Sequence, residues 1–171
     1  MIHSFFINSL TSFTETLLHI SALAGHFEFT EALLNEKFEL ASRLDSLNRS
    51  PLHLASAEGH TEIAKALLRA NLDVCMVPDE EGRIPLHLAV IRGQVEVIRE
   101  LINAQPNSVL EKLNGYTVLH IAVKYNQLKA LKQLVTQLNE DEILDFTDHL
   151  GNTILHLAVM LKQSEVSTKT L

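Results

Sequence analysis

The feature that most constrains this chain is a Leu-His pair that recurs at nearly constant spacing. The pairs lie in the segments TLLHIS, SPLHLA, IPLHLA, TVLHIA and TILHLA. Successive histidines are 34, 34, 33 and 36 residues apart, at His19, His53, His87, His120 and His156. A period of this length is typical of repeat proteins, in which each unit is one supersecondary element that stacks on its neighbours.

Further shared positions extend the repeat beyond the Leu-His pair. Six residues after the first three histidines lie Gly25, Gly59 and Gly93, and Asn126 holds that place in the fourth copy. Beyond them, apolar residues at i, i+1, i+4 and i+5 predict one buried helix face per copy. The predicted faces are Phe29, Leu33 and Leu34; Ile63, Ala64, Leu67 and Leu68; Val97, Ile98, Leu101 and Ile102; and Ala130, Leu131, Leu134 and Val135.

Each unit is therefore predicted to be two helices joined by a turn. Ser or Thr before the first helix suits an N-cap, Pro51 and Pro85 suit its first position, and glycine or asparagine suits the left-handed residue that ends it. Turn-forming residues connect the units in DSLNRS, DEEGRI, LNGYT and DHLGNT. Because Ile84 takes the N-cap position without a hydrogen-bond acceptor, we expect Ile84→Thr to stabilise the protein by about 1 kcal/mol.

This unit resembles the ankyrin repeat, whose signature is T-P-L-H-x-A with a period of 33 residues. The resemblance implies an all-α ankyrin-repeat solenoid of helix-turn-helix units with projecting β-hairpin turns, stabilised by contacts between neighbouring units. We expect an N-terminal extension at 1–13 and a repeat domain at 14–163. Its full repeats are predicted at about 14–47, 48–81, 82–114 and 115–150, followed by a partial fifth at 151–163.

The predicted C-terminal tail, residues 164–171, departs from the repeat pattern. In SEVSTKTL, serine and threonine occupy positions where a second helix would carry apolar residues. This favours a shortened product or an incomplete gene model, with a frayed natural C-terminus as the alternative.

Composition excludes several classes of function. The net charge of −7 argues against nucleic acid as a partner, because phosphate binding needs a basic face. A single cysteine, Cys75, allows no intrachain disulfide and favours a reducing compartment. No apolar run reaches the roughly 20 residues of a membrane span, and no Lys or Arg precedes SALAG as a signal peptide would require. We expect a cytoplasmic monomer.

The histidines do not have the spacing of a metal site. His53 and His60 are seven residues apart, roughly 10 Å along a helix, which is too far for one ion. We expect each Leu-His ring to hydrogen-bond the backbone of its own or the next turn instead. Cys75 has no activating neighbour, and no phosphate-binding loop or nucleophile motif occurs. We predict no catalytic residue, no metal and no cofactor.

The predicted binding surface is the concave face, which fingers and first helices form in repeat arrays. The ankyrin resemblance places variable positions around the turn glycine and just before the helix-ending residue. In the fingers these are Leu47, Arg49, Glu81, Arg83, Asn114, Tyr116, Leu150 and Asn152; on the helices they are Glu58, Arg92, Lys124 and Tyr125. Because Tyr and Arg dominate interface hot spots, repeats three and four are the strongest candidates, with ordinary exposed residues as the alternative.

Three segments resemble one ankyrin subgroup more closely. They are ETLLHISALAGHFEFTEALL, YTVLHIAVKYNQLKALKQLV and DHLGNTILHLAVMLKQ, and they resemble plant defence-related proteins with ankyrin repeats before a Pro-Gly-Gly-containing, multi-span membrane domain. That domain is absent from this sequence, although relatives that carry it would lie at the plasma membrane.

The sequence therefore leaves three hypotheses. The first is a non-enzymatic protein-interaction adaptor in plant defence or stress signalling. The second is the truncated cytosolic part of a membrane-anchored ankyrin signalling or transport-like protein. The third, an enzyme or metalloprotein, has no motif in its favour.

Overall fold

The computed structural model of the chain describes residues 16–138 and 146–161. The predicted N-terminal extension at 1–13 and the predicted tail at 164–171 lie outside the described residues. Within the described ranges no helix is both long and apolar enough to cross a lipid bilayer.

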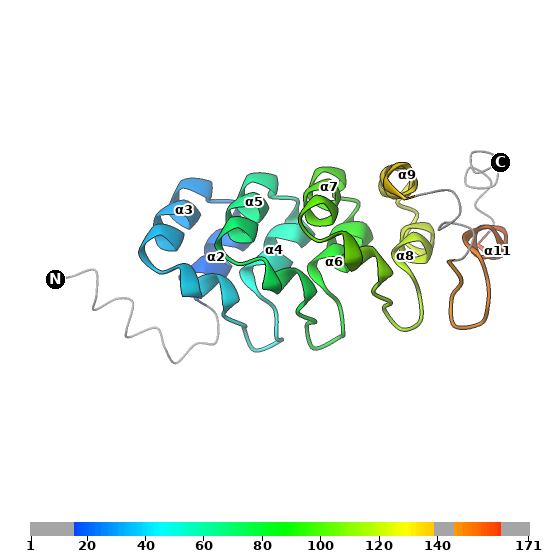
Figure 1. Cartoon of the computed structure of the whole chain (residues 1–171), viewed down its shortest axis with the longest axis horizontal. Helices are drawn as coiled ribbons and strands as arrows, with labels where there is room; N and C mark the ends of the chain where they lie inside the picture. The colour runs from blue at the N-terminus through cyan, green and yellow to red at the C-terminus, as the bar shows by residue number, and fades with distance from the viewer. Residues whose placement is uncertain (1–15, 139–145, 162–171) are drawn as a thin grey trace.

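The described residues form helix pairs stacked in one row, with a loop projecting from each junction (Figure 1). The first helices of the repeats are α2 (Leu17–Ala24), α4 (Pro51–Glu58), α6 (Pro85–Arg92), α8 (Val118–Lys124) and α11 (Ile154–Met160). The second helices are α3 (Phe27–Glu36), α5 (Thr61–Ala70), α7 (Val95–Ala104) and α9 (Leu128–Gln137). Short 3₁₀ turns follow three of them: η1 (Phe38–Ser42), η2 (Asp73–Met76) and η3 (Pro106–Leu110). This arrangement confirms the predicted all-α repeat solenoid.

The first helices end where the sequence predicts. Gly25, Gly59 and Gly93 adopt left-handed φ angles of 79°, 83° and 73°, and Asn126 substitutes for glycine with φ 54°. The Gly25 and Gly59 N–H groups donate to the carbonyls of Ser21 and Ala55, four residues earlier. A residue with a bulky side chain would be strained in this conformation, so the helix stops and the chain turns into the second helix.

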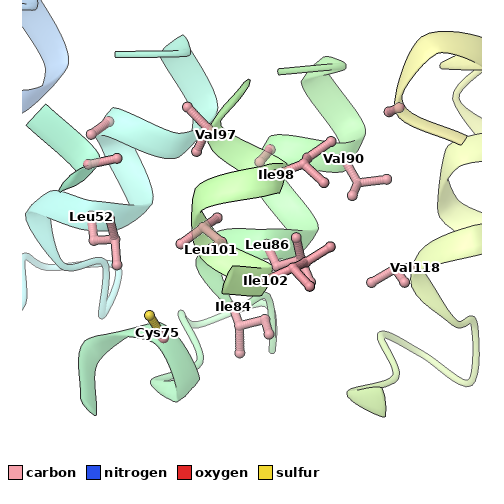
Figure 2. Packing of buried hydrophobic residues seen from close by; sticks show 14 of the residues in the cluster. Leu52, Cys75, Ile84, Leu86, Val90, Val97, Ile98, Leu101, Ile102 and Val118 are labelled. Carbon is pink, nitrogen blue, oxygen red and sulfur yellow. The ribbon is translucent and has the colours of Figure 1, made fainter. Parts of the chain in front are cut away.

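The core lies between the repeats as well as within them. Leu52 of α4, Leu86 of α6 and Leu101 of α7 are almost fully buried and belong to one continuous apolar cluster (Figure 2). Burying a leucine side chain contributes about 1.5–3 kcal/mol. In a repeat array, such contacts between neighbouring repeats add to the stability of each repeat.

The predicted apolar face of the first repeat is partly wrong. Phe29 is 48% exposed, whereas its equivalents Ile63 and Val97 in the next repeats are buried. The neighbouring Thr30 is buried instead, and its hydroxyl lies 2.6 Å from that of Ser21. The physical reason is position: among the described residues no preceding repeat stacks against α3, so the outer side of this helix is not covered.

Candidate functional site

The Leu-His histidines link each repeat to the next. The Nε2 atoms of His19, His53, His87 and His120 lie 2.9, 3.1, 3.2 and 2.9 Å from backbone carbonyl oxygens in the following connection. The acceptors are Arg49, Arg83, Glu111 and Asn152, respectively. We call this set the histidine ladder. In these four repeats the ring bonds the backbone of the next connection, which is the kind of contact that we predict for the Leu-His histidines.

The other ring nitrogen fixes the protonation state. In the second repeat the Ser50 N–H donates to His53 Nδ1 at 3.0 Å, and the Ser50 hydroxyl lies 2.9 Å from the same atom. Because Nε2 faces a carbonyl oxygen, it must carry the proton, and Nδ1 of the neutral ring is then an acceptor. The Ser50 hydroxyl therefore donates to the ring. The predicted N-cap residues thus act chiefly through histidine.

Burial keeps these rings neutral. Removal from water lowers the pKa of His53 to about 4. The hydrogen bond from the ring to the Arg83 backbone and the charges of nearby acids raise the pKa, but burial outweighs them. The same burial lowers the pKa values of His87 and His120. A protonated ring would place an Nδ1 proton against the Ser50 N–H, so charging breaks the helix cap as well.

A second ladder runs along the residues that follow the helix-ending glycines. The side chains of His60, Gln94 and Gln127 reach back to the preceding repeat and meet the carbonyls of Leu23, Ala57 and Ile91 at 3.2, 3.1 and 2.9 Å. These side chains also pack closely against the helix-ending glycines: a Cβ on Gly25 would lie 2.7 Å from the His60 ring. Glycine is therefore required there both for its φ angle and for space.

The loops that project from the row are defined here as finger 1 (45–49), finger 2 (79–83), finger 3 (112–116) and finger 4 (148–152). In finger 2, Asp79 is 5% exposed and accepts from the Glu81 N–H at 3.0 Å and the Arg83 N–H at 2.8 Å. Arg83 Nε also donates to the carboxylate at 2.8 Å. The buried aspartate thus closes the finger.

Fingers 1 and 4 repeat this aspartate clamp. Asp45 accepts from the Leu47 and Arg49 N–H groups and from the Arg49 side chain. Burial raises the pKa of Asp45, but the bonds from Arg49 and Leu47 outweigh it and hold the pKa below its usual value. Asp148 accepts from Leu150 and Asn152 in the same way.

The clamp changes the interpretation of three predicted binding residues. The side chains of Arg49, Arg83 and Asn152 are engaged by the aspartate four residues before them. The signal was present in the sequence: an aspartate precedes the Leu-His histidine by eight residues in three of the four connections. These side chains hold the fingers in shape and have less freedom to meet a partner than we predicted.

Finger 3 lacks the clamp because Lys112 takes the aspartate position. Leu113 and Tyr116 instead exchange two backbone hydrogen bonds of 2.9 Å, and they form an isolated β-bridge. Asn114 and Gly115 make the turn between them with φ 51° and 81°. Positive φ at both central residues is the geometry that Asn-Gly favours in a two-residue hairpin.

Two of the predicted binding residues, Tyr116 and Lys124, are in contact. Lys124 Nζ lies 4.7 Å from the centroid of the Tyr116 ring, and Tyr116 meets His149 of finger 4 edge-to-face at 5.4 Å. Tyr125, the residue after Lys124, is 46% exposed, and Arg92 is exposed at the equivalent place in the preceding repeat. We call Arg92, Lys112, Tyr116, Lys124 and Tyr125 the repeat-four patch.

The predicted positions outside the clamps and the patch are also exposed. Glu58 is exposed at the end of α4, and Glu81 is exposed on finger 2, where it pairs with Arg83 at 2.6 Å. Leu47 and Leu150 project from fingers 1 and 4 with 44% and 71% exposure, and Asn114 is exposed at the tip of finger 3.

Metal binding and cysteine reactivity are the two remaining kinds of site that the sequence raises. Across the described ranges no group of three His, Cys, Asp or Glu side chains is arranged to hold a metal ion. Cys75 is buried, and burial raises the pKa of its thiol to about 11. A thiol with a raised pKa carries little thiolate and is a poor nucleophile.

Stacked helix pairs, tied by side-chain ladders and presenting a row of fingers, define a repeat-solenoid scaffold. A family model described as "Ankyrin repeats (3 copies)" matches residues 2–77, 71–143 and 86–169. The chain belongs to the ankyrin-repeat family, and its repeats form a protein-interaction module. A comparison with curated proteins finds no match.

Proposed function

We propose that this chain is a non-enzymatic adaptor that binds a partner protein through its concave face in plant defence or stress signalling. The interaction role follows from the ankyrin array. The signalling context and a cytoplasmic location rest on the resemblance of LHIAVKYNQ and GNTILHLAVMLKQ to the plant defence-related subgroup.

The observation that carries the binding role is the contrast between occupied and unoccupied side chains on this face. Arg49 and Arg83 are committed to the clamps, and the Leu-His rings to the histidine ladder. In the described residues Arg92 and Tyr125 serve no such purpose and are exposed. Arginine and tyrosine are enriched among residues that dominate interface energies.

The test is affinity capture or proximity labelling in the source organism with the full chain and its variants. We expect Arg92→Glu and Tyr125→Ala each to reduce recovery of the same partner. Arg69→Glu is the matched control, because Arg69 is exposed on α5 and the charge change is identical. Undiminished capture by both patch variants would show that the partner binds elsewhere.

A second candidate is the cytosolic part of a membrane-anchored ankyrin signalling or transport-like protein. The observation that favours it is the exposure of Val159 on α11, 68%, where its equivalents Val90 and Val123 are fully buried by the next repeat. A valine at this register suits a covering repeat. Transcript sequencing tests this: a Pro-Gly-Gly motif and apolar spans of about 20 residues downstream in frame would support the candidate.

A further inference from the structure

Charge is distributed unevenly along the array. Between Glu111 and Glu140 the chain carries four lysines and no acidic residue, although the whole chain has 21 acids and a net charge of −7. The lysines are Lys112 in finger 3, Lys124 at the end of α8, and Lys129 and Lys132 on α9. Residues 112–139, which include finger 3, α8 and α9, are therefore a cationic segment in an otherwise acidic protein.

The lysines fall on two sides of this repeat. Lys112 and Lys124 belong to the finger and first helix, which form the concave face, together with Arg92 of the preceding repeat. Lys129 and Lys132 lie on the second helix, beside a groove of about 620 Å³ that also includes Gln94, Glu96 and Thr136. This division provides an internal control, because each side carries two of the four lysines on a different surface.

The concave cations are not neutralised by acidic side chains of the described residues. Every ion pair described in the structure involves other basic residues: Arg49, Lys65, Arg83 and Arg99. Lys112 Nζ donates to a backbone carbonyl, that of Thr147, at 3.2 Å, and Lys124 lies over the Tyr116 ring. Neither contact supplies an acidic partner from the described residues.

We propose that the repeat-four patch binds an acidic, extended peptide segment of a partner protein, whose carboxylates pair with Arg92 and Lys124 while its backbone runs past Tyr116 and Tyr125. This rests on the proposed interaction function and names the partner chemistry. An arginine fork suits bidentate carboxylate binding, and the adjoining aromatic rings add apolar contact area. The acidic remainder of the chain repels the same segment elsewhere, which directs it to this repeat.

Other anionic occupants are distinguishable outcomes. A lipid surface or RNA would use phosphate charge, and a second copy of this chain would use its acidic first two repeats. The sequence also places Glu140, Asp141, Glu142 and Asp145 directly after α9. The measurement uses the full chain, so its result includes any effect of these acidic residues.

The experiment measures fluorescence anisotropy of a labelled decapeptide of alternating glutamate and serine, with a glutamine-serine peptide as the control ligand. We expect the glutamate peptide alone to bind, with affinity falling as salt rises. Arg92→Glu and Lys124→Glu should each weaken binding about tenfold or more. Lys129→Glu and Lys132→Glu change the net charge of the protein by the same amount as those two variants. They should weaken peptide binding less than about threefold.

Several results would overturn the proposal. Equal losses on both sides of the repeat would show general charge attraction. Tighter binding to phosphatidylserine vesicles or single-stranded RNA through the same residues would assign a different ligand, as would concentration-dependent dimers that Lys124→Glu dissolves. Circular dichroism of each variant establishes that it is folded. If Arg92→Glu abolishes partner capture while no acidic peptide binds, the interaction function stands and the proposed partner chemistry fails.

Discussion

Fingers 2 and 3 occupy equivalent places in the array but are closed by different means. Finger 2 is held by one buried carboxylate, that of Asp79, which satisfies two backbone N–H groups and the Arg83 side chain. Finger 3 is held by the paired backbone bonds of Leu113 and Tyr116 around an Asn-Gly turn. The exchange of aspartate for Lys112 accompanies the shortest histidine spacing of the chain, 33 residues.

The comparison shows that the closure of a finger also sets what it can bind. In finger 2 the arginine is consumed by the clamp and by Glu81. In finger 3 the residue at that position, Tyr116, is free to pack against Lys124 and His149. Loss of the clamp therefore removes a buried negative charge and leaves a cationic, aromatic surface at the same place.

The histidine ladder spans both kinds of finger, so acid should weaken them together. The pKa of His53 is near 6.5 when unfolded and about 4 when folded, so the unfolded chain binds more protons between these values. Stability is fully present above pH 6.5 and falls as pH drops toward 4, by roughly 3 kcal/mol for His53 alone. Urea denaturation across this range measures the loss.

The effect of protonating the histidine ladder can be distinguished from the effect of protonating the carboxylates. The carboxylates of Asp45 and Asp148 have lowered pKa values, so their protonation weakens the protein only at lower pH, below the histidine range. His53→Gln keeps a side chain that can donate and accept but does not titrate. We expect the His53→Gln protein to be less stable at neutral pH and to lose less unfolding free energy as the pH falls from 6.5 to 4. An unchanged dependence of stability on pH would contradict the role of the histidine ladder.

Removing the aspartate clamp should destabilise finger 2 far more than the equivalent change destabilises finger 3. Asp79→Ala leaves three donors without their acceptor, and we expect a loss of about 2–4 kcal/mol in the free energy of unfolding. The equivalent change in finger 3, Lys112→Ala, removes an exposed side chain and should cost no more than about 0.5 kcal/mol. Both are measured by urea denaturation. Similar losses at the two positions would mean that finger 3 depends on its side chain after all.

The fold could be predicted because its signals are local and repeated. Gly59 and Pro51 specify where a helix ends and begins, and His53 recurs at a fixed distance from both. The exposure of Phe29 could not be predicted from its own pattern, since burial of that position depends on a neighbour that stacks from outside the repeat.

The binding face was predictable only in part. The family pattern indicates which positions vary, but not which of them are already occupied. Arg83 and Arg92 are the same residue type at two predicted positions, yet among the described residues only Arg83 pairs with a carboxylate. That distinction depends on the aspartate four residues earlier, a spacing that can be recognised once the clamp is known.

Glycine-to-alanine substitutions compare the turns of fingers 3 and 4. Gly115 and Gly151 have similar φ angles, 81° and 77°, so alanine should cost each about 1 kcal/mol of backbone strain. A Cβ on Gly115 would also lie 2.6 Å from the His149 Cβ, whereas nothing lies within 4 Å of one on Gly151. We expect Gly115→Ala to cost about 2 kcal/mol and Gly151→Ala about 1 kcal/mol. Equal melting shifts would show that finger 4 yields without cost.

The smallest effect concerns the cap that follows finger 2. A threonine at position 84 gains about 1 kcal/mol by supplying a hydroxyl for His87 Nδ1, which already accepts from the residue 84 N–H at 3.2 Å. The structure adds an opposing term, because Ile84 is 3% exposed in the core (Figure 2). Loss of its outer methyl group costs about 0.5–1.5 kcal/mol, so the net change should lie near zero.

Ile84→Val separates the two contributions, because valine has the shape of threonine without the hydroxyl. We expect Ile84→Val to be less stable than the parent protein by about 0.5–1.5 kcal/mol, and Ile84→Thr to exceed Ile84→Val by about 1 kcal/mol. Thermal unfolding of the three proteins at pH 7 measures both differences. Threonine no more stable than valine would mean that the hydroxyl does not reach His87, and that the cap of this repeat depends on the ring and the backbone alone.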